Sequence, residues 1–207
     1  MLQTLINAFK VKDIRVKVWK MLLLLLIFRI GCYIPIPGLD TSAFSDSVTG
    51  NDFLTLMNSI TGGSLANGTL FALGIGPYIN ASIIMQLLCV GIPALERLSK
   101  QGEEGQKKIA QYTRYCTILL AVIQSIGIIV NFANQSNAVN KSLFFDSAFL
   151  AGFFMTVVYT AGAFLVMWLG ERITDYGVGN GQSMIIFVGI LATAGQAIIA
   201  KIMDIPN

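Results

Sequence analysis

The sequence predicts an all-α polytopic membrane protein with five transmembrane helices. Of its 207 residues, 55% are apolar and only 12% are charged, and the mean hydropathy is +0.70, a balance outside the range of ordinary soluble domains. Five stretches approach the roughly 20 apolar residues that a helix needs to cross the hydrocarbon core. They cover residues 21–37, 70–93, 116–132, 149–170 and 184–203.

Residues 1–20 precede the first span and combine an apolar face with a basic run. Their apolar residues recur at helical spacing, as on one face of an amphipathic helix. This pattern fits a short helix on the cytoplasmic membrane surface and, equally, a plain basic flank. The apolar residues concerned are Leu2, Leu5, Ile6 and Phe9.

The first span, residues 21–37, differs from a cleaved signal peptide. Its apolar run is long, and no small-residue cleavage signal precedes the "IPIPG" that follows, so we expect it to stay in the mature chain. Arg29 lies inside this span, where an unpaired charge costs about 2.5 to 3.5 kcal/mol. We therefore expect Arg29 to reach the interface, to pair, or to face a polar interior.

The segment 38–69 joins the first two spans and contains a second helical pattern. Asp52 is a plausible N-terminal cap, and Gly62 and Gly63 end the pattern. We expect a half-length helix, too short to span a membrane, followed by a flexible "GGSLANG". The apolar residues that share one face of this helix are Phe53, Leu56, Met57 and Ile60.

The second span, residues 70–93, is interrupted by Gly74, Gly76 and Pro77. Irregular backbone at membrane depth is tolerated only where it is buried in protein or lines a water-filled cavity, so the break favours a cavity. Beyond it, Ile75, Ile79, Ile83 and Gln86 share one helical face, with Asn80 and Ser82 on its flanks. Side-chain amides in hydrocarbon are costly unless they meet water or a partner. The amides of Asn80 and Gln86 therefore either face a water-filled cavity or hydrogen-bond to a neighbouring helix.

The distribution of Lys and Arg predicts the orientation, because cytoplasmic segments collect these residues. Leaving the intramembrane Arg29 aside, eleven lie in residues 1–20, 94–115 and 171–183, whereas only Lys141 and Lys201 belong to the other side. The N-terminus is therefore predicted to be cytoplasmic. Residues 38–69, 133–148 and 204–207 are then external.

Catalysis, metal binding and a bound cofactor are not expected. The chain has no histidine, and Cys32, Cys89 and Cys116 fall in or beside apolar spans, as small fillers do. The glycine-rich "GVGNGQS" at 177–183 lacks the strand and the lysine of a phosphate loop, so we read it as a tight turn in which Asn180 or Ser183 caps the fifth helix. The charged segment 96–108 is either a solvated connection or a docking surface.

Five strings together resemble one family. They are "FRIGCYIPIPG" at 28–38, "FALGIGPYINASIIMQLL" at 71–88, "QYTRY" at 111–115, "MWLGERIT" at 167–174 and "GVGNGQS" at 177–183. In order and spacing they resemble the N-terminal half of the SecY family, the channel subunit of the bacterial protein translocon. The resemblance implies one half of an inverted-repeat clamshell of ten helices, acting as a protein-conducting channel.

The resemblance also implies site residues. A short external plug helix corresponds to about residues 52–67, that is, to Asp52, Phe53, Leu56, Met57, Ile60, Gly62 and Gly63. The apolar pore ring corresponds to Ile75 and Ile79 from the second helix and to Gln182 and Ile186 from the fifth. Gln182 departs from the isoleucine usual in the family, and its amide would weaken the seal unless it turns aside. The lateral gate and funnel correspond to Asn80, Ile83, Gln86 and Gln124.

The implied partners are small membrane subunits of the SecE and SecG types, the SecA motor ATPase, the ribosome, signal sequences of secretory precursors and membrane lipids. Nucleic acid would be met only by way of the ribosome, and the location would be the bacterial cytoplasmic membrane. The sequence stops after the fifth span, so we expect a fragment or one half of a split protein. The alternative function is half of an inverted-repeat secondary transporter, which also uses broken helices near the midplane.

Overall fold

The structure is a computed structural model that describes residues 11–37, 39, 45, 48, 50, 52–135, 148–176 and 179–203. Within these residues the chain is helical, which confirms the predicted all-α class. The helices are α2 (Lys12–Gly31), α4 (Asp52–Ile60), α5 (Gly76–Gly91), α6 (Pro93–Ser99), α7 (Glu103–Gln135), α8 (Ala148–Asp175) and α9 (Gly181–Met203).

Three of the described helices are long and apolar enough to cross a membrane: α7, α8 and α9. They coincide with the predicted third, fourth and fifth spans. Helices α5 and α6 together pass the same test but are bent by 107° relative to each other, because Ile92 is extended and Pro93 starts a new helix. These long apolar helices are those of a membrane protein.

Helix α2 differs from the predicted first span in its limits. It begins at Lys12, within the basic run, and ends at Gly31, so the apolar part of the helix is shorter than residues 21–37. The amphipathic helix predicted near the N-terminus rests on residues 1–10, which lie outside the described residues. Helix α2 packs against α8 and α9.

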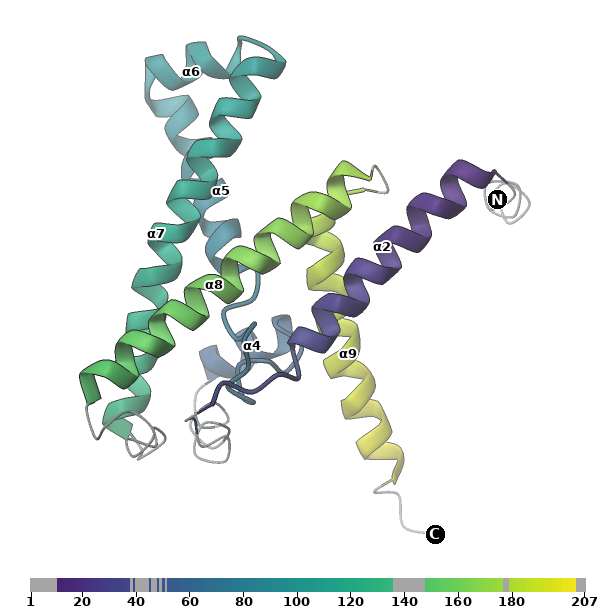
Figure 1. The fold of residues 1–207 in the computed structure, drawn as a ribbon, viewed down its shortest axis with the longest axis vertical. Helices are drawn as coiled ribbons and strands as arrows, with labels where there is room; N and C mark the ends of the chain where they lie inside the picture. The colour runs from purple at the N-terminus through teal and green to yellow at the C-terminus, as the bar shows by residue number, and fades with distance from the viewer. Residues whose placement is uncertain are drawn as a thin grey trace.

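The helices form one layered bundle around α8 (Figure 1). Helix α7 packs between α5 and α8, and α8 packs against α9. The hairpin of α5, α6 and α7 extends beyond the rest of the bundle, while α4 lies near the opposite end. In that hairpin the connection predicted as residues 94–115 contains α6 and the first turns of α7.

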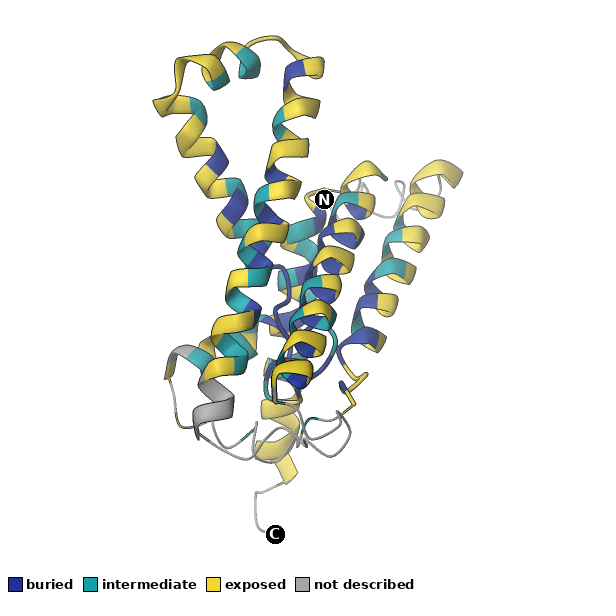
Figure 2. Ribbon diagram, turned by 60° about the vertical axis from the view of Figure 1, so that its left-hand side comes forward, coloured by how far each residue is buried: buried dark blue, intermediate teal, exposed yellow. Residues whose placement is uncertain are grey.

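Buried side chains form two apolar clusters in the described part of the chain. The first lies beside α4 and contains Ile36, Val48, Leu65, Ala72, Leu73, Ala121, Met155, Tyr159 and Ala163. The second joins α2, α5, α8 and α9 and contains Leu25, Phe28, Cys32, Phe71, Ile75, Val166, Leu169, Ile173 and Ile185. Large apolar residues on the outer faces of the helices remain exposed (Figure 2), as expected where lipid or another protein covers them.

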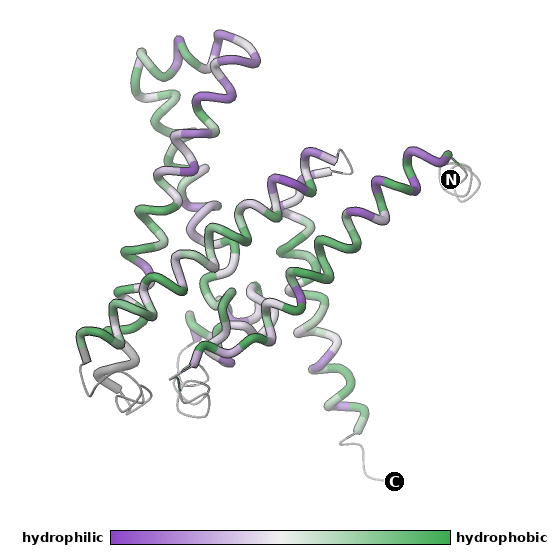
Figure 3. Tube along the Cα trace, in the orientation of Figure 1, coloured by the Kyte–Doolittle hydropathy of each residue, from purple (hydrophilic) through white to green (hydrophobic). Residues whose placement is uncertain are grey.

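Hydrophilic residues gather at one end of the bundle (Figure 3). The start of α2, the turn around α6 and the end of α8 lie at this end, and the apolar stretches lie between it and the α4 end. Three ion pairs of the described residues belong to it: Arg114 with Glu171 at 2.8 Å, between α7 and α8, Lys100 with Glu96 at 2.6 Å, and Arg172 with Asp175 at 3.4 Å. The segments rich in Lys and Arg therefore share one side of the molecule.

Candidate functional site

The break before α5 is built by glycine and proline. Gly74 has a φ of 54°, in the left-handed region that favours glycine, and α5 begins at Gly76 with Pro77 in its first turn, where the missing N–H costs nothing. The prediction of a helix start at this string is confirmed. The segment of turns before it is anchored, because Leu70 N donates to Ile34 O at 3.0 Å.

The residues predicted for a ring lie around one apolar cluster. Ile75 is only 4% exposed, and Ile79 and Ile186 are half-buried and pack against the same cluster of α2, α5, α8 and α9 side chains. The start of α5 and the first turns of α9 are therefore brought together, although they are far apart in the sequence. Ile75, Ile79 and Ile186 thus share one apolar cluster, to which side chains of α2 and α8 also belong.

Gln182, the fourth predicted ring residue, is half-buried and packs near α8. A Cβ placed on Gly170 would lie 3.4 Å from Gln182 Cγ and 3.5 Å from Ile75 Cδ1. The absence of a side chain at Gly170 thus gives room to the stem of Gln182.

The residues predicted for a plug form α4 and the turn after it. Asp52 is the first helical residue rather than the cap before it, Leu56 is exposed, and Met57 and Ile60 are half-buried. Nothing is described of the Phe53 side chain. Gly62 and Gly63 have φ values of 72° and 86° and end the helix as predicted.

The expected flexibility of "GGSLANG" is wrong, because this segment is packed and hydrogen-bonded. Ser64 and Leu65 are buried. Ala66 N donates to Asn58 Oδ1 at 2.8 Å, and Ser64 Oγ donates to Thr61 O at 2.9 Å. Within the string itself, Asn67 Nδ2 donates to Gly63 O at 3.0 Å, so side chains of the string and of the end of α4 satisfy backbone groups here.

Helix α4 is held against α9 at a glycine. A Cβ on Gly189 would overlap the carbonyl oxygen of Ile60, so only glycine permits this approach. In the same region Thr193 Oγ1 donates to Ser59 O at 3.2 Å. The end of the short helix therefore rests on the middle of α9.

Arg29 pairs rather than remaining free. Its Nη1 donates to Gly62 O at 3.4 Å and its Nη2 donates to Tyr33 Oη at 3.4 Å. The guanidinium also lies 5.4 Å from the centre of the Tyr33 ring, within the range of a cation–π contact. Of the outcomes expected for a charge inside the first span, pairing is the one observed.

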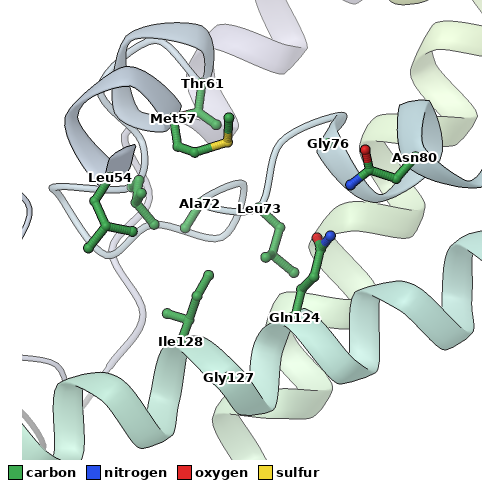
Figure 4. Close-up of a pocket in the computed structure, with 11 residues that line it drawn as sticks. Leu54, Met57, Thr61, Ala72, Leu73, Gly76, Asn80, Gln124, Gly127 and Ile128 are labelled. Atoms are coloured by element: carbon green, nitrogen blue, oxygen red, sulfur yellow. The ribbon is translucent and has the colours of Figure 1, made fainter. Parts of the chain in front are cut away.

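A pocket of about 530 Å³ lies between α4, the segment before α5, and α7 (Figure 4). Its walls are mostly apolar, and the amides of Asn80 and Gln124 reach toward each other from α5 and α7. The break in the second span thus lies beside a cavity, as the sequence predicts. The full lining is Leu54, Met57, Thr61, Leu65, Ala72, Leu73, Gly76, Asn80, Gln124, Gly127 and Ile128.

The other two residues predicted for a gate lie apart from this pocket. Ile83 and Gln86 are exposed further along α5 and are not in its lining. Sequence reasoning missed Leu54, Gly127 and Ile128, which do line it. For Leu54, the only available signal in the sequence was its place in the predicted short helix, next to residues of the predicted apolar face.

Two polar contacts fix the ends of the helices. Asn180 Oδ1 accepts hydrogen bonds from Gln182 N at 3.0 Å and Ser183 N at 3.3 Å, which confirms Asn180 as the cap of α9. Thr174 Oγ1 accepts from Gly181 N at 2.9 Å, a contact that the sequence analysis missed. Thr174 is the last residue of the string "MWLGERIT", and its place in that string was the only sequence signal for this contact.

The chain is similar to known SecY proteins. The profile of the SecY family matches residues 69–206. The protein translocase subunit SecY of Staphylococcus carnosus (strain TM300) is 44% identical over 200 residues, which are 96% of this chain and 46% of that protein. The same subunit of Streptomyces scabiei is 46% identical over 207 residues, covering 96% of this chain and 47% of that protein.

A third relative, the protein translocase subunit SecY of Staphylococcus aureus, is 43% identical with the same coverage as the Staphylococcus carnosus subunit. The chain thus spans about half the length of the curated relatives it matches. The matching profile covers well over half of the chain and includes the broken start of α5, the part of the pocket lining from Ala72 onward, and α9. The chain therefore belongs to the SecY family.

Proposed function

We propose that this chain is one half of the central pore-forming subunit of the Sec translocon, through which unfolded secretory proteins cross the cytoplasmic membrane and membrane segments leave sideways. The observation that carries the proposal is that Ile75, Ile79 and Ile186 share one apolar cluster, while a short helix that cannot span a membrane packs against α9. Relatives named as protein translocase subunits support it.

In this proposal the isoleucines seal the channel at rest. An apolar constriction excludes hydrated ions by dewetting, and isoleucine side chains yield to a passing chain because they hold it by no polar contact. Helix α4 is the plug on the external side, which must move before a chain passes. No bond is made or broken by these residues, so a partner supplies the energy.

The proposal includes five spans, with α2 as the first and α5 with its broken start as the second. The common side of the Lys- and Arg-rich segments supports a cytoplasmic N-terminus. Asn80 and Gln124 line the lateral gate, with Ile83 and Gln86 facing the funnel. The partners are SecE- and SecG-type subunits, SecA, the ribosome, signal sequences and lipids.

Photocrosslinking tests the proposal. A photoreactive residue at Ile79 is expected to crosslink to a stalled secretory precursor in the assembled translocon, and the crosslink should depend on an intact signal sequence. Leu119, exposed on the outer side of α7, is the matched control and should give no such crosslink. Absence of the Ile79 crosslink in an assembled, inserted complex, together with saturable uptake of a small solute, would favour a transporter.

An ion-leak measurement tests the seal separately. Replacing Ile75 and Ile79 by glycine removes both side chains from the apolar cluster, so the ion current through the resting translocon should rise by roughly tenfold or more, because an apolar barrier of this kind depends on the side chains that narrow it. The control is Ile84→Gly, which adds the same helix-weakening residue on an exposed side of α5. Equal leak from both variants would contradict the seal.

A further inference from the structure

The charged side chain of Arg29 lies at the C-terminal end of α4. The last carbonyls of a helix have no partner within the helix, and they carry the negative end of the helix dipole. Arg29 Nη1 donates to the oxygen of Gly62, in the turn that ends α4, at 3.4 Å. A charge that is costly in an apolar span is thus placed where the protein offers negative potential.

Other donors at this helix end also come from neighbouring helices. Ser59 O accepts from Thr193 Oγ1 of α9 at 3.2 Å, and the Cys32 thiol, just after α2, lies 4.0 Å from Thr61 O. Three carbonyls at or just after the end of α4, those of Ser59, Thr61 and Gly62, are therefore met by side chains from α2, from the residue after it, and from α9. A segment that is covered only by apolar packing would not need these contacts.

The two flanking helices are also linked to each other at this point. Tyr33 Oη accepts from Arg29 Nη2 at 3.4 Å and from Gln196 Nε2 at 3.3 Å. Gly62 occupies the space between them: a Cβ on Gly62 would overlap Arg29 Nη1 and come within 3.2 Å of Gly189 Cα. Arg29, Tyr33 and Gln196 thus connect α2 to α9 across the end of α4.

We propose that Arg29 is a positioning residue that holds α4 in its resting place, with Tyr33 and Gln196 setting the geometry of the guanidinium. Withdrawal of α4 breaks the contact of Arg29 with Gly62 and exposes the charge, so the contact sets how easily α4 moves. The inference rests on the proposed function, in which α4 closes the channel. A contact that only satisfied the charge of Arg29 would leave the mobility of α4 unchanged. In the role proposed here, the mobility of α4 depends on Arg29.

Amide hydrogen exchange in the purified translocon, held in lipid nanodiscs, tests the inference directly. R29Q should raise exchange of residues 52–68 on the order of tenfold, the factor expected for loss of a hydrogen bond to a charged group. R29K keeps the charge and should raise exchange less. The matched control is R15Q, the same change at an exposed position of α2, which should leave exchange in this segment unchanged. Equal exchange in R29Q and the unmodified protein would overturn the inference.

A second variant covers the case in which R29Q weakens the whole fold, seen as faster exchange in α7 and α8 as well. Y33F keeps Arg29 and the aromatic ring but removes the oxygen that Arg29 and Gln196 share. A rise of about threefold confined to residues 52–68 is expected, from the loss of a neutral hydrogen bond. No rise with Y33F in that case would overturn the inference.

Ion leak through the same preparations separates this inference from the proposed function. Faster exchange with greater leak in R29Q supports both. Faster exchange without greater leak supports the role of Arg29 in holding α4 and overturns the role of α4 as the closure. Unchanged exchange, with leak raised by deletion of residues 52–67, overturns the positioning role and leaves the proposed function standing.

Discussion

Helices α8 and α9 are equally apolar and yet differently covered. The most apolar window of each has a mean hydropathy of 2.0, but 33% of that window is buried in α8 and 11% in α9. Helix α8 packs against α2, α5, α7 and α9, whereas α9 meets α8, α4 and the end of α2 on one side only. Hydropathy therefore predicts which helices cross the membrane and not how many neighbours each one has.

The close contacts of α8 follow from its small residues. A Cβ on Gly162 would overlap the carbonyl oxygen of Leu70, and one on Gly181 of α9 would overlap that of Gly170. Since lipid is as apolar as leucine, helices in a membrane associate through close packing of this kind. On its other side, α9 keeps Phe187, Leu191 and Ile198 exposed, an open face available to lipid or to another protein.

The largest expected difference between the two helices comes from truncating one leucine in each. Leu169 of α8 is 3% exposed and Leu191 of α9 is 58% exposed. Leu169→Ala should lower the free energy of unfolding by about 2 to 4 kcal/mol, because it leaves a cavity among packed side chains. Leu191→Ala should cost well under about 1 kcal/mol.

Unfolding of the 207-residue chain by SDS in mixed micelles, followed through the fluorescence of Trp19 and Trp168, measures both variants. Each is compared with the unmodified chain at the same detergent composition. A cost at Leu191 equal to that at Leu169 would show that α9 is covered as fully as α8, which would remove the difference between the helices.

A glycine in each helix gives the next largest effect. Gly162→Ala in α8 places a methyl group against the backbone of Leu70, which can give way only by a shift of α8 or of the buried segment before α5, so a loss of about 1 to 3 kcal/mol is expected. Gly195→Ala in α9 has no atom within 4 Å of the added Cβ and should be neutral or stabilising by up to about 1 kcal/mol. The same SDS titration applies, and a Gly162→Ala chain as stable as the parent would contradict the close packing of α8.

The smallest expected effect concerns the ion pair of Arg114 and Glu171, which joins α7 to α8 at 2.8 Å. Because the Arg114 side chain is 50% exposed, solvent screens the pair, and its coupling should be about 0.5 kcal/mol. A double-mutant cycle of R114Q and E171Q measures it, and the coupling should shrink in high salt. A coupling above about 2 kcal/mol would mean that the pair is desolvated.

Local chemistry made part of the site predictable. Gly74 and Gly76 weaken a helix, and Pro77 is tolerated only in the first turn of one. The break at this string could therefore be predicted from these residues alone. Asn180 or Ser183 was likewise predicted as the cap of the fifth helix because a short polar side chain after glycine and before an apolar run suits that position, and Asn180 is the cap observed. Both features depend on residues within a few positions of each other.

The contacts of α4 could not be predicted in the same way. "GGSLANG" has the composition of a flexible linker, but Asn58 and Asn67 use their side chains to satisfy its backbone. The partner of Arg29 is Gly62, and nothing near either residue in the sequence indicates the other. Gln124 and Asn80 share a pocket only because α7 packs on α5.

The sequence by itself determined that this protein is helical and crosses a membrane, where its second span breaks, and that its strings resemble SecY. These properties depend on hydropathy and on local backbone geometry, which a short window of residues contains. Only the tertiary structure decided that α8 is covered and α9 left open, and that Arg29 meets the end of α4. Such contacts depend on how closely backbones approach at single glycines, and that distance is set by the whole bundle.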